Sequence, residues 1–168
     1  MPKALRVLEL FATLHEHRVR YIVIGGIAAA LHGSPLMTVD VDICPDTHPA
    51  NLQRLCDALR AMNARIRTAS EDDGVDFQCH PELLAGMRML NLVTDFGELD
   101  LTFEPPAFEN GYSDLAPQAV AIPVGSVEVR IAALDNVIES KEQANRPKDR
   151  AALPVLYALR DEIAERDR

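Results

Sequence analysis

Cysteine is scarce in this sequence, and the three cysteines that occur are scattered. Cys44, Cys56 and Cys79 form no CxxC pair, and their number is odd. This spacing fits neither a zinc site, which needs clustered ligands, nor a disulfide framework. We therefore expect three reduced, buried thiols in a cytoplasmic protein.

Long apolar runs are missing as well. No stretch approaches the roughly 20 consecutive apolar residues that a membrane-spanning helix needs. Near the amino terminus, Arg6, Glu9 and His15 interrupt the apolar residues, so the continuous hydrophobic region of a signal peptide does not form. The sequence predicts no membrane partner and no secretion signal.

Positive charge is in the minority. Lys and Arg number 17 against 26 Asp and Glu, which gives a net charge of −9 at pH 7. A protein that coats DNA or RNA needs a broad basic surface to displace phosphate counterions, so this class is excluded. A local basic patch beside an acidic, metal-binding pocket is compatible with the same total.

What the sequence does contain is enough apolar material for a sizeable core. Of its 168 residues, 48% are hydrophobic, which suits one folded domain and excludes a disordered chain. Periodicity and the positions of glycine and proline predict alternating helices and strands. In order, these are a helix over 4–17, a strand over 21–24, a turn at 25–26, a helix over 27–33, a strand over 38–43, a helix from about 49 to 62, weak strands within 64–79, a helix over 81–90, strands over 91–94 and 98–103, a loop over 104–118, strands over 119–123 and 126–131, and helices from about 133.

This order of elements predicts an α/β (α+β) fold, with a mixed sheet flanked by helices. We expect a single domain in two parts. Residues 1–131 form the α/β core, and residues 132–168 form a C-terminal helical segment packed on that core.

Two carboxylates stand one residue apart on the predicted strand over 38–43. Because side chains alternate along a strand, Asp40 and Asp42 share one face, with Cα atoms about 7 Å apart. The opposite, core-facing side takes Val39, Val41 and Ile43. Neighbouring carboxylates raise each other's pKa unless a cation lies between them, and Mg²⁺ binds such carboxylates together with substrate phosphates. The pair therefore predicts a metal site; the alternative is a solvated strand face.

A third carboxylate lies on the predicted strand over 98–103. There Leu99, Leu101 and Phe103 share the core face, and Asp100 takes the other. If this strand lies beside the first, three carboxylates converge. Such a set can hold two metal ions around a phosphoryl group that undergoes in-line displacement.

Gly25 and Gly26 lie between a predicted buried strand and a helix. Glycine lets the backbone approach a ligand closely, and the free amides at a helix start attract phosphate. The alternative is a tight turn without a ligand. Here, however, the pair is followed by a helix and then by the acidic strand.

These motifs together resemble the nucleotidyltransferase superfamily that includes DNA polymerase β. The stretch Ile24-Gly25-Gly26-Ile27-Ala28-Ala29-Ala30-Leu31-His32-Gly33, followed by Thr38-Val39-Asp40-Val41-Asp42, is more narrowly similar to small bacterial nucleotidyltransferases grouped with the AbiEii-type toxins of toxin–antitoxin systems. Asp100 matches the third carboxylate of that group. The stretches 132–141 and 146–149 also resemble it.

The resemblance implies a metal-dependent enzyme that transfers a nucleoside monophosphate from an NTP to a hydroxyl of an RNA end, a protein or a small molecule. Asp40, Asp42 and Asp100 would bind Mg²⁺ or Mn²⁺ and carry catalysis, and Asp100 would help to deprotonate the attacking hydroxyl. The implied partners are the NTP, a tRNA or protein acceptor and a cognate antitoxin protein. Nucleotide binding is implied for Gly25, Gly26, Thr38 and Lys141.

Lys141 also has an argument of its own. In the helix from about 134, Leu134, Val137 and Ile138 define the inward face, and Lys141 falls on it at i+7. An inward lysine usually has an anionic partner; the alternative is a lysine that extends to solvent at the helix end, where a cation also suits the dipole. Nearby, Arg146, Lys148 and Arg150 form a basic patch. This patch either contacts nucleic acid or is a solvated charged face.

One feature of the related proteins is missing here. They often carry an arginine shortly before the threonine of the acidic strand, whereas the stretch from Ser34 to Thr38 has no basic residue. A phosphate or substrate contact is therefore absent or supplied by another element. This keeps two alternatives open: a non-catalytic nucleotide-binding or regulatory module, and a structural domain without a ligand. His32, in the short helix, is expected to be a packed or surface residue rather than a catalytic one.

Overall fold

Seven strands form one mixed sheet in the computed structural model, which describes residues 3–168. Across the sheet the order within this part of the chain is β3-β4-β5-β2-β1-β7-β6. β2 pairs with β5, and β1 with β7, in parallel, whereas the other neighbours are antiparallel. The strands are β1 (Tyr21–Ile24), β2 (Asp40–Pro45), β3 (Arg65–Ile66), β4 (Met89–Thr94), β5 (Gly97–Thr102), β6 (Val120–Val124) and β7 (Val127–Ile131). The predicted mixed sheet is confirmed.

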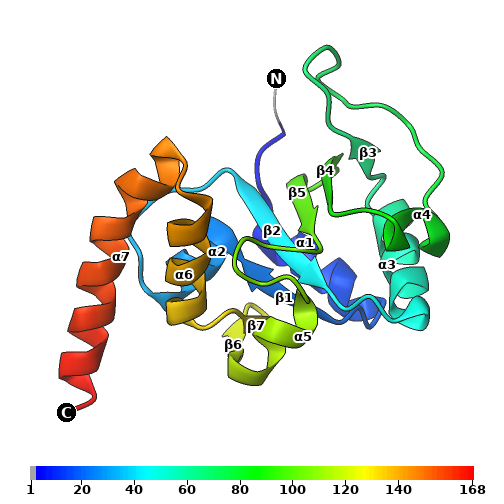
Figure 1. Cartoon of the computed structure of the whole chain (residues 1–168). Coiled ribbons are helices and arrows are strands. Elements are labelled where there is room, and N and C mark those ends of the chain that lie inside the picture. Colours follow the sequence, from blue (N-terminus) through cyan, green and yellow to red (C-terminus); the bar gives the residue numbers. More distant parts are fainter. Residues whose placement is uncertain (1–2) are drawn as a thin grey trace.

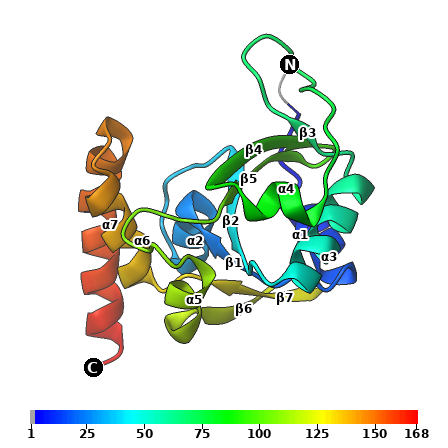
Figure 2. The same ribbon diagram turned by 45° about the vertical axis from the view of Figure 1, so that its right-hand side comes forward.

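Most of the helices gather at two ends of this sheet (Figures 1 and 2). α2, α6 and α7 lie at one end, where α6 packs against both α2 and α7, and α3 and α4 lie at the other. No described helix combines the length and the apolarity that crossing a bilayer requires. The predicted division between residues 1–131 and 132–168 stays a prediction. The helices are α1 (Val7–Glu16), α2 (Gly25–His32), α3 (Pro49–Ala61), α4 (Pro81–Ala85), α5 (Tyr112–Leu115), the 3₁₀ turn η1 (Ala116–Gln118), α6 (Leu134–Ala144) and α7 (Pro147–Arg166).

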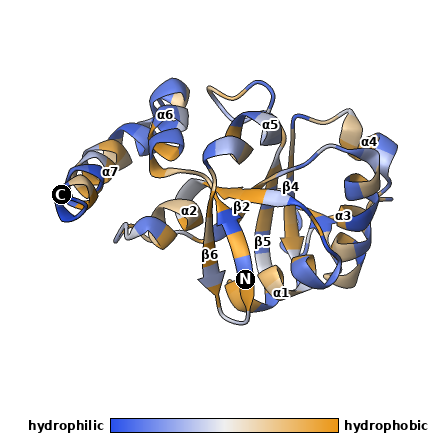
Figure 3. Ribbon diagram, turned by 90° about the horizontal axis from the view of Figure 1, so that it is seen from below, coloured by the Kyte–Doolittle hydropathy of each residue, from blue (hydrophilic) through white to orange (hydrophobic). Residues whose placement is uncertain are grey.

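The core lies between the strands and the helices that cover them. The strands are largely apolar, whereas α3 carries polar and apolar residues on different faces (Figure 3). On β2, Val41 and Ile43 are fully buried, and the alternate residues Asp40 and Asp42 are half-buried, as the alternation predicts. The prediction for Val39 is wrong, because β2 begins at Asp40, two residues later than predicted, and Val39 is 75% exposed in the preceding loop.

Four other predicted segments differ from the structure. Residues 64–79 form little sheet, with only β3 and a single bridge from Ile66 to Val75. The helix predicted over 81–90 ends at Ala85, because the following residues turn into β4 and pair with β5. The segment 104–118 contains α5 and η1 instead of loop alone. Helix α2 begins at Gly25 itself, without a separate turn.

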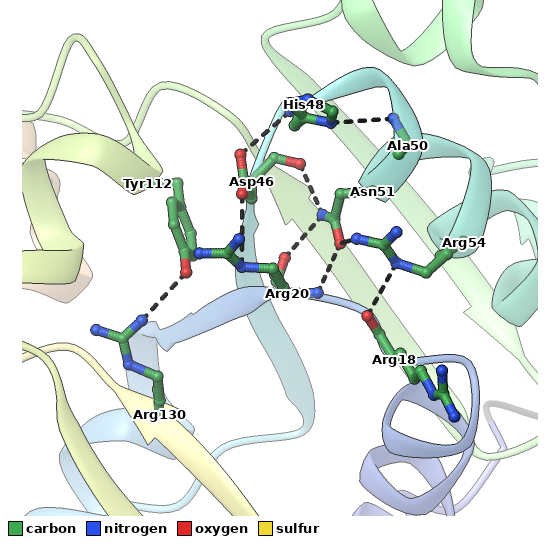
Figure 4. Close-up of polar contacts among 9 residues, drawn as sticks. All are labelled: Arg18, Arg20, Asp46, His48, Ala50, Asn51, Arg54, Tyr112 and Arg130. Carbon is green, nitrogen blue, oxygen red and sulfur yellow. Dashed lines mark hydrogen bonds and ion pairs between the residues drawn. The ribbon is translucent and has the colours of Figure 1, made fainter.

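A polar network fixes the far end of β2 to its surroundings (Figure 4). Its centre is the fully buried side chain of Asn51 in the first turn of α3. The amide of Asn51 donates to the backbone oxygens of Arg20 (2.9 Å) and Asp46 (2.7 Å), and its oxygen accepts from the backbone N–H of Arg20 (2.7 Å). Arg54 adds bonds to Asn51 and to the backbone oxygen of Arg18. The network therefore sets where β1 begins and where β2 ends.

Replacing Asn51 with alanine is expected to lower the free energy of unfolding by about 3 kcal/mol, because buried backbone groups of two segments lose their partners at once. Urea denaturation measures this loss. Gln53→Ala is the matched control, since this exposed amide on the same helix bonds only to the side chain of Asp57, and it should change stability by less than about 0.5 kcal/mol. Equal losses in the two variants would show that the network does not anchor the strands.

Candidate active site

Three carboxylates converge on one face of the sheet. Asp40 and Asp42 lie on β2, and Asp100 lies on β5 directly opposite Asp42 in the parallel ladder. One oxygen from each side chain falls within 4.8 Å of the other two. The convergence that the sequence predicts is thus present, and β2 and β5 produce it by being neighbours at the centre of the sheet (Figure 1).

Burial raises the proton affinity of two of these carboxylates, Asp42 and Asp100. Burial first, and then the charges of Asp40 and Asp100, raises the pKa of Asp42 to about 7, against the opposing charges of Lys148 and Lys141. Burial also raises the pKa of Asp100 to about 6, although the nearby guanidinium of Arg67 opposes the shift. Without a cation between them, the three groups therefore resist simultaneous ionisation at neutral pH.

The donor set fits a hard divalent cation. All three ligating groups are carboxylates, and oxygen ligands of this kind suit Mg²⁺ and Mn²⁺. A divalent ion between them removes the mutual repulsion that adds to burial in raising the pKa values of Asp42 and Asp100. Thr38 supports this geometry, since its hydroxyl donates to Oδ1 of Asp40 at 3.1 Å.

The start of α2 faces the triad closely. Gly25 has a φ of +65°, and a Cβ atom there would collide with the carboxylate of Asp42. A Cβ atom on Gly26 would come within 2.8 Å of the Cβ of Thr38. Ile24, which precedes the helix, offers no side-chain cap to the first amides. The two glycines therefore allow uncapped helix amides to lie against the acidic strand.

Gly25→Ala is expected to displace Asp42 and to abolish nucleotide binding, because the new methyl group combines a strained φ with a collision. We expect destabilisation of about 1–3 kcal/mol, measured by urea denaturation, together with loss of nucleotide-dependent thermal stabilisation. Gly86→Ala is the control. Its φ is −91° and the nearest atom to a new Cβ is 3.9 Å away, so it should behave as the native protein. Full nucleotide binding by the Gly25 variant would contradict the close approach.

A cluster of cations forms the opposite wall, and it is organised around one buried acid. Asp149 in the first turn of α7 is fully buried. It accepts bonds from the backbone N–H of Arg146 at 3.1 Å and from Nε of the same residue at 2.7 Å, and Nζ of Lys141 lies 3.7 Å away. Burial alone would raise the pKa of Asp149, but the bonds from Arg146 hold this pKa below its usual range.

This cluster settles how Lys141 is placed. Its side chain is 20% exposed and has the anionic partner that an inward lysine usually requires, so it does not simply extend to solvent. Arg146 and Lys148 face the same cavity, whereas Arg150 donates to the backbone oxygen of Asn145 at 2.6 Å. The predicted basic patch is therefore divided, with two of its members turned toward the acidic site.

A single large cavity of about 940 Å³ joins these groups. It is lined by all seven residues that the sequence nominates: Gly25, Gly26, Thr38, Asp40, Asp42, Asp100 and Lys141. His32 is packed as expected, with Nε2 2.8 Å from the backbone oxygen of Ala132. A volume near the upper end of the usual range for small-molecule sites, roughly 300–1,000 Å³, suits a nucleotide with room beside it.

Two lining residues escaped the sequence analysis. Asn136 on α6 is 6% exposed, and its Nδ2 has no hydrogen-bond partner among the described residues. Arg67 follows β3; its Nη2 lies 2.8 Å from Oδ1 of Asp100, and its Nη1 lies 3.2 Å from Glu98. Arg67 thus brings a cation to the site from another element, since none lies between residues 34 and 38. The sequence could have indicated Asn136, because a polar residue next to the apolar face of a helix is conspicuous. No pattern in the residues around Arg67 indicates that its side chain reaches the site.

This geometry defines a class of fold. The structure has two carboxylates on β2, a third on the parallel strand β5, and a glycine-opened helix between β1 and β2. The sequence resemblance predicts this arrangement. The solved structures described next confirm the fold of this superfamily, whereas the narrower similarity to AbiEii-type toxins stays a prediction.

Solved structures share this fold over nearly the whole chain. Lincosamide antibiotic adenylyltransferase LnuA, solved with lincomycin bound, is 12% identical with a TM-score of 0.60, covering 94% of this chain and 99% of its own. ANT(2")-Ia, solved with adenylyl-2"-tobramycin, is 15% identical with a TM-score of 0.55 over 96% and 97%. TM1012 from Thermotoga maritima, described as a nucleotidyltransferase, is 13% identical with a TM-score of 0.55 over 97% of both chains. No family model and no curated protein matches the sequence.

Proposed function

We propose that this protein transfers a nucleoside monophosphate from an NTP to a hydroxyl acceptor and releases pyrophosphate. One observation carries the proposal. Three carboxylates, with oxygens within 4.8 Å of one another, lie in a cavity between the uncapped start of a helix and a cluster of cations. Acidic groups that bind a divalent ion and basic groups that bind phosphate are the two requirements of nucleotidyl transfer.

Asp40, Asp42 and Asp100 are the residues that would hold Mg²⁺ or Mn²⁺. When bound, the metal would neutralise charge on the phosphates and orient the attacking and leaving oxygens. We assign to Asp100 a second role, acceptance of the proton of the attacking hydroxyl, as the sequence resemblance implies. The hydroxyl oxygen bonds to the α-phosphorus while the bond from that phosphorus to pyrophosphate breaks.

The triphosphate would lie between α2 and α6. The amides of Gly25 and Gly26 face this space, and Lys141 and Lys148 supply positive charge. Nδ2 of Asn136, which has no hydrogen-bond partner among the described residues, supports the same ligand. A buried donor without an acceptor costs about 1–3 kcal/mol, and a bond to a phosphate oxygen offsets that cost. Thr38 acts indirectly, by holding Asp40.

The solved neighbours and the sequence resemblance support different acceptors. LnuA and ANT(2")-Ia are solved with small antibiotics or their adenylyl product, which supports a small-molecule acceptor and an adenylyl donor for this chain. A toxin role, a cognate antitoxin, a tRNA or protein acceptor and a cytoplasmic location rest on the sequence alone and stay predictions.

The test is a transfer assay with each of the four α-³²P-labelled NTPs and Mg²⁺ or Mn²⁺. Small hydroxyl compounds, total tRNA and a protein extract are offered separately as acceptors. Label on an acceptor with the native protein, but not with an Asp40→Asn, Asp42→Asn variant, supports the proposal and identifies the base. Metal-dependent NTP binding without transfer to any acceptor favours the non-catalytic module instead. Absence of both transfer and binding rejects the enzyme.

A further inference from the structure

We propose that Cys56 and Cys79 form an oxidation site, at which hydrogen peroxide converts the two thiols into a disulfide that ties α3 to the start of α4. All three cysteines of the chain are buried, as the sequence predicts. Their spacing in the sequence pairs no two of them, whereas their positions in the fold do. This inference does not depend on nucleotidyl transfer.

Two of the three thiols are in direct contact. Sγ of Cys79 donates to Sγ of Cys56 at 2.7 Å, although the two residues are 79 − 56 = 23 positions apart in the chain. A disulfide bond is about 2 Å long, so the two sulfurs need only a small shift in order to bond. Cys44 differs, because its thiol donates to the backbone oxygen of Phe103 at 3.9 Å instead of contacting a sulfur.

The backbone on both sides holds this pair in place. Cys56 lies within α3, which packs against α4 at one end of the sheet (Figures 1 and 2). Cys79 directly precedes His80, which caps α4 by accepting from the backbone N–H of Leu83 at 3.3 Å. Arg60, one turn after Cys56, donates to the backbone oxygen of Cys79 at 2.5 Å. The two sulfurs therefore meet between anchored segments.

Metal binding is the alternative use of two adjacent thiols. A structural zinc ion in a protein usually takes four ligands from cysteine and histidine. Within residues 3–168, however, the aspartate triad is the only group of three or more such side chains close enough to share an ion. The positive charge of Arg60, which acts on both thiols, also opposes a bound cation. The surroundings of the pair therefore favour oxidation over metal binding.

Access and proton affinity decide where and how fast the oxidant reacts. Cys79 is 7% exposed, whereas Cys56 and Cys44 are fully buried, so a small peroxide meets Cys79 first. Burial raises the pKa of the Cys56 and Cys79 thiols, although the charge of Arg60 opposes the shift. Because the thiolate is the reactive form, we expect oxidation over minutes to hours rather than seconds.

The reaction has two steps. The sulfur of Cys79 attacks one oxygen of hydrogen peroxide and the O–O bond breaks, which gives a sulfenic acid and, with the proton of the thiol, one water. The sulfur of Cys56 then attacks the sulfur of Cys79 and expels hydroxide, which takes the second thiol proton and leaves as another water. Two electrons pass from the thiols to the peroxide.

The test counts thiols in the full chain before and after treatment with hydrogen peroxide, under denaturing conditions. We expect the count to fall from three to one. Trypsin leaves each cysteine in a different peptide, because Cys44 lies within 21–54, Cys56 within 55–60 and Cys79 within 68–88. Mass spectrometry without reduction should find 55–60 joined to 68–88, with a mass lower by two hydrogens than the sum of the two peptides.

The cross-link should also stabilise the fold. Closing a loop of this length restricts the unfolded chain, so Tm should rise by about 5–10 °C and return to its original value with dithiothreitol. Cys44→Ser is the matched control, and it should form the same link with the same rise. Cys79→Ser should form no link and gain no stability, which also shows how far methionine oxidation affects Tm.

Four outcomes would overturn the oxidation site. They are retention of all three thiols, addition of oxygen to the cysteines without a link, a link through Cys44, and a link that leaves Tm unchanged or lower. None of them bears on nucleotidyl transfer, which the acceptor assay tests separately.

Discussion

Asp42→Asn is expected to eliminate nucleotidyl transfer and, at the same time, to stabilise the metal-free protein above pH 7. The activity loss follows from removing one of three carboxylates that would bind the metal, and should reach at least about 10³-fold, or about 4 kcal/mol of transition-state stabilisation. The free energy of unfolding should rise, because without a metal the clustered carboxylates repel one another and Asp42→Asn removes one of these charges.

The sign follows from the pKa of Asp42, which folding raises from about 3.8 to about 7. Below the lower value the carboxyl is protonated in both states. As the pH rises toward 7, the unfolded chain releases its proton while the folded protein retains it, so folding becomes progressively less favourable. Above pH 7 this penalty is complete. Asparagine carries no such penalty, so the gain should be larger at pH 8 than at pH 5.

Thermal unfolding at pH 5 and pH 8, with and without Mg²⁺, checks this expectation. Mg²⁺ should raise the native Tm more at pH 8 than at pH 5, because protons compete for the same oxygens, and it should affect the Asn variant little. Asp161→Asn, which removes an exposed carboxylate on α7, is the control for net charge. A metal-free Asp42→Asn protein less stable than the native one at pH 8 would show that Asp42 is not held under electrostatic strain.

The second large effect is expected at Asp149. Asp149→Ala should lower the free energy of unfolding by about 3 kcal/mol, since breaking a buried ion pair commonly costs 3–5 kcal/mol and the half-exposed Arg146 can regain water. The nucleotide affinity should fall as well, because Arg146 and Lys141 lose the acid that orients them. Urea denaturation and NTP titration measure the two losses.

Asp149→Asn separates charge from hydrogen bonding. Its side-chain oxygen still accepts from the backbone N–H of Arg146, so we expect it to lose only about half as much stability, roughly 1.5 kcal/mol. Asp161→Ala, lower on the same helix, should change neither stability nor binding. If Asp149→Ala unfolded in one cooperative transition, as a folded protein does, but bound the NTP as tightly as the native protein, the orientation of Lys141 would not depend on this acid.

The sequence predicted the acidic strand and its glycine-opened helix well because both are local. Alternation fixes which face Asp40 and Asp42 share, and a Gly-Gly pair between a strand and a helix has few backbone solutions. The pairing of Asp100 with Asp42 required the resemblance, since strand order is not a local property. The prediction that Val39 faces the core was wrong, because alternation does not locate the first residue of a strand.

The cations were harder to predict than the carboxylates. Lys141 was visible from helical periodicity, but its partner Asp149 lies on the next helix and is positioned by the turn between them. Arg67 reaches Asp100 because β3, β4 and β5 pair in succession. Neither the spacing of these two residues nor the composition of the chain predicts this contact. Long-range pairing of this kind depends on how the whole sheet assembles.

The parallel pairing of β1 with β7 has a consequence for the order in which the protein matures. Val23 pairs with Ile131, a separation of 131 − 23 = 108 residues, and Lys141 and Asp149 follow later still. During synthesis the three carboxylates therefore leave the ribosome well before Lys141, Arg146 and Lys148, which form the cationic wall. A nascent chain can gather its acidic groups early, but it gains a phosphate-binding wall only when the last helices dock, so nucleotide competence should be the final event of folding.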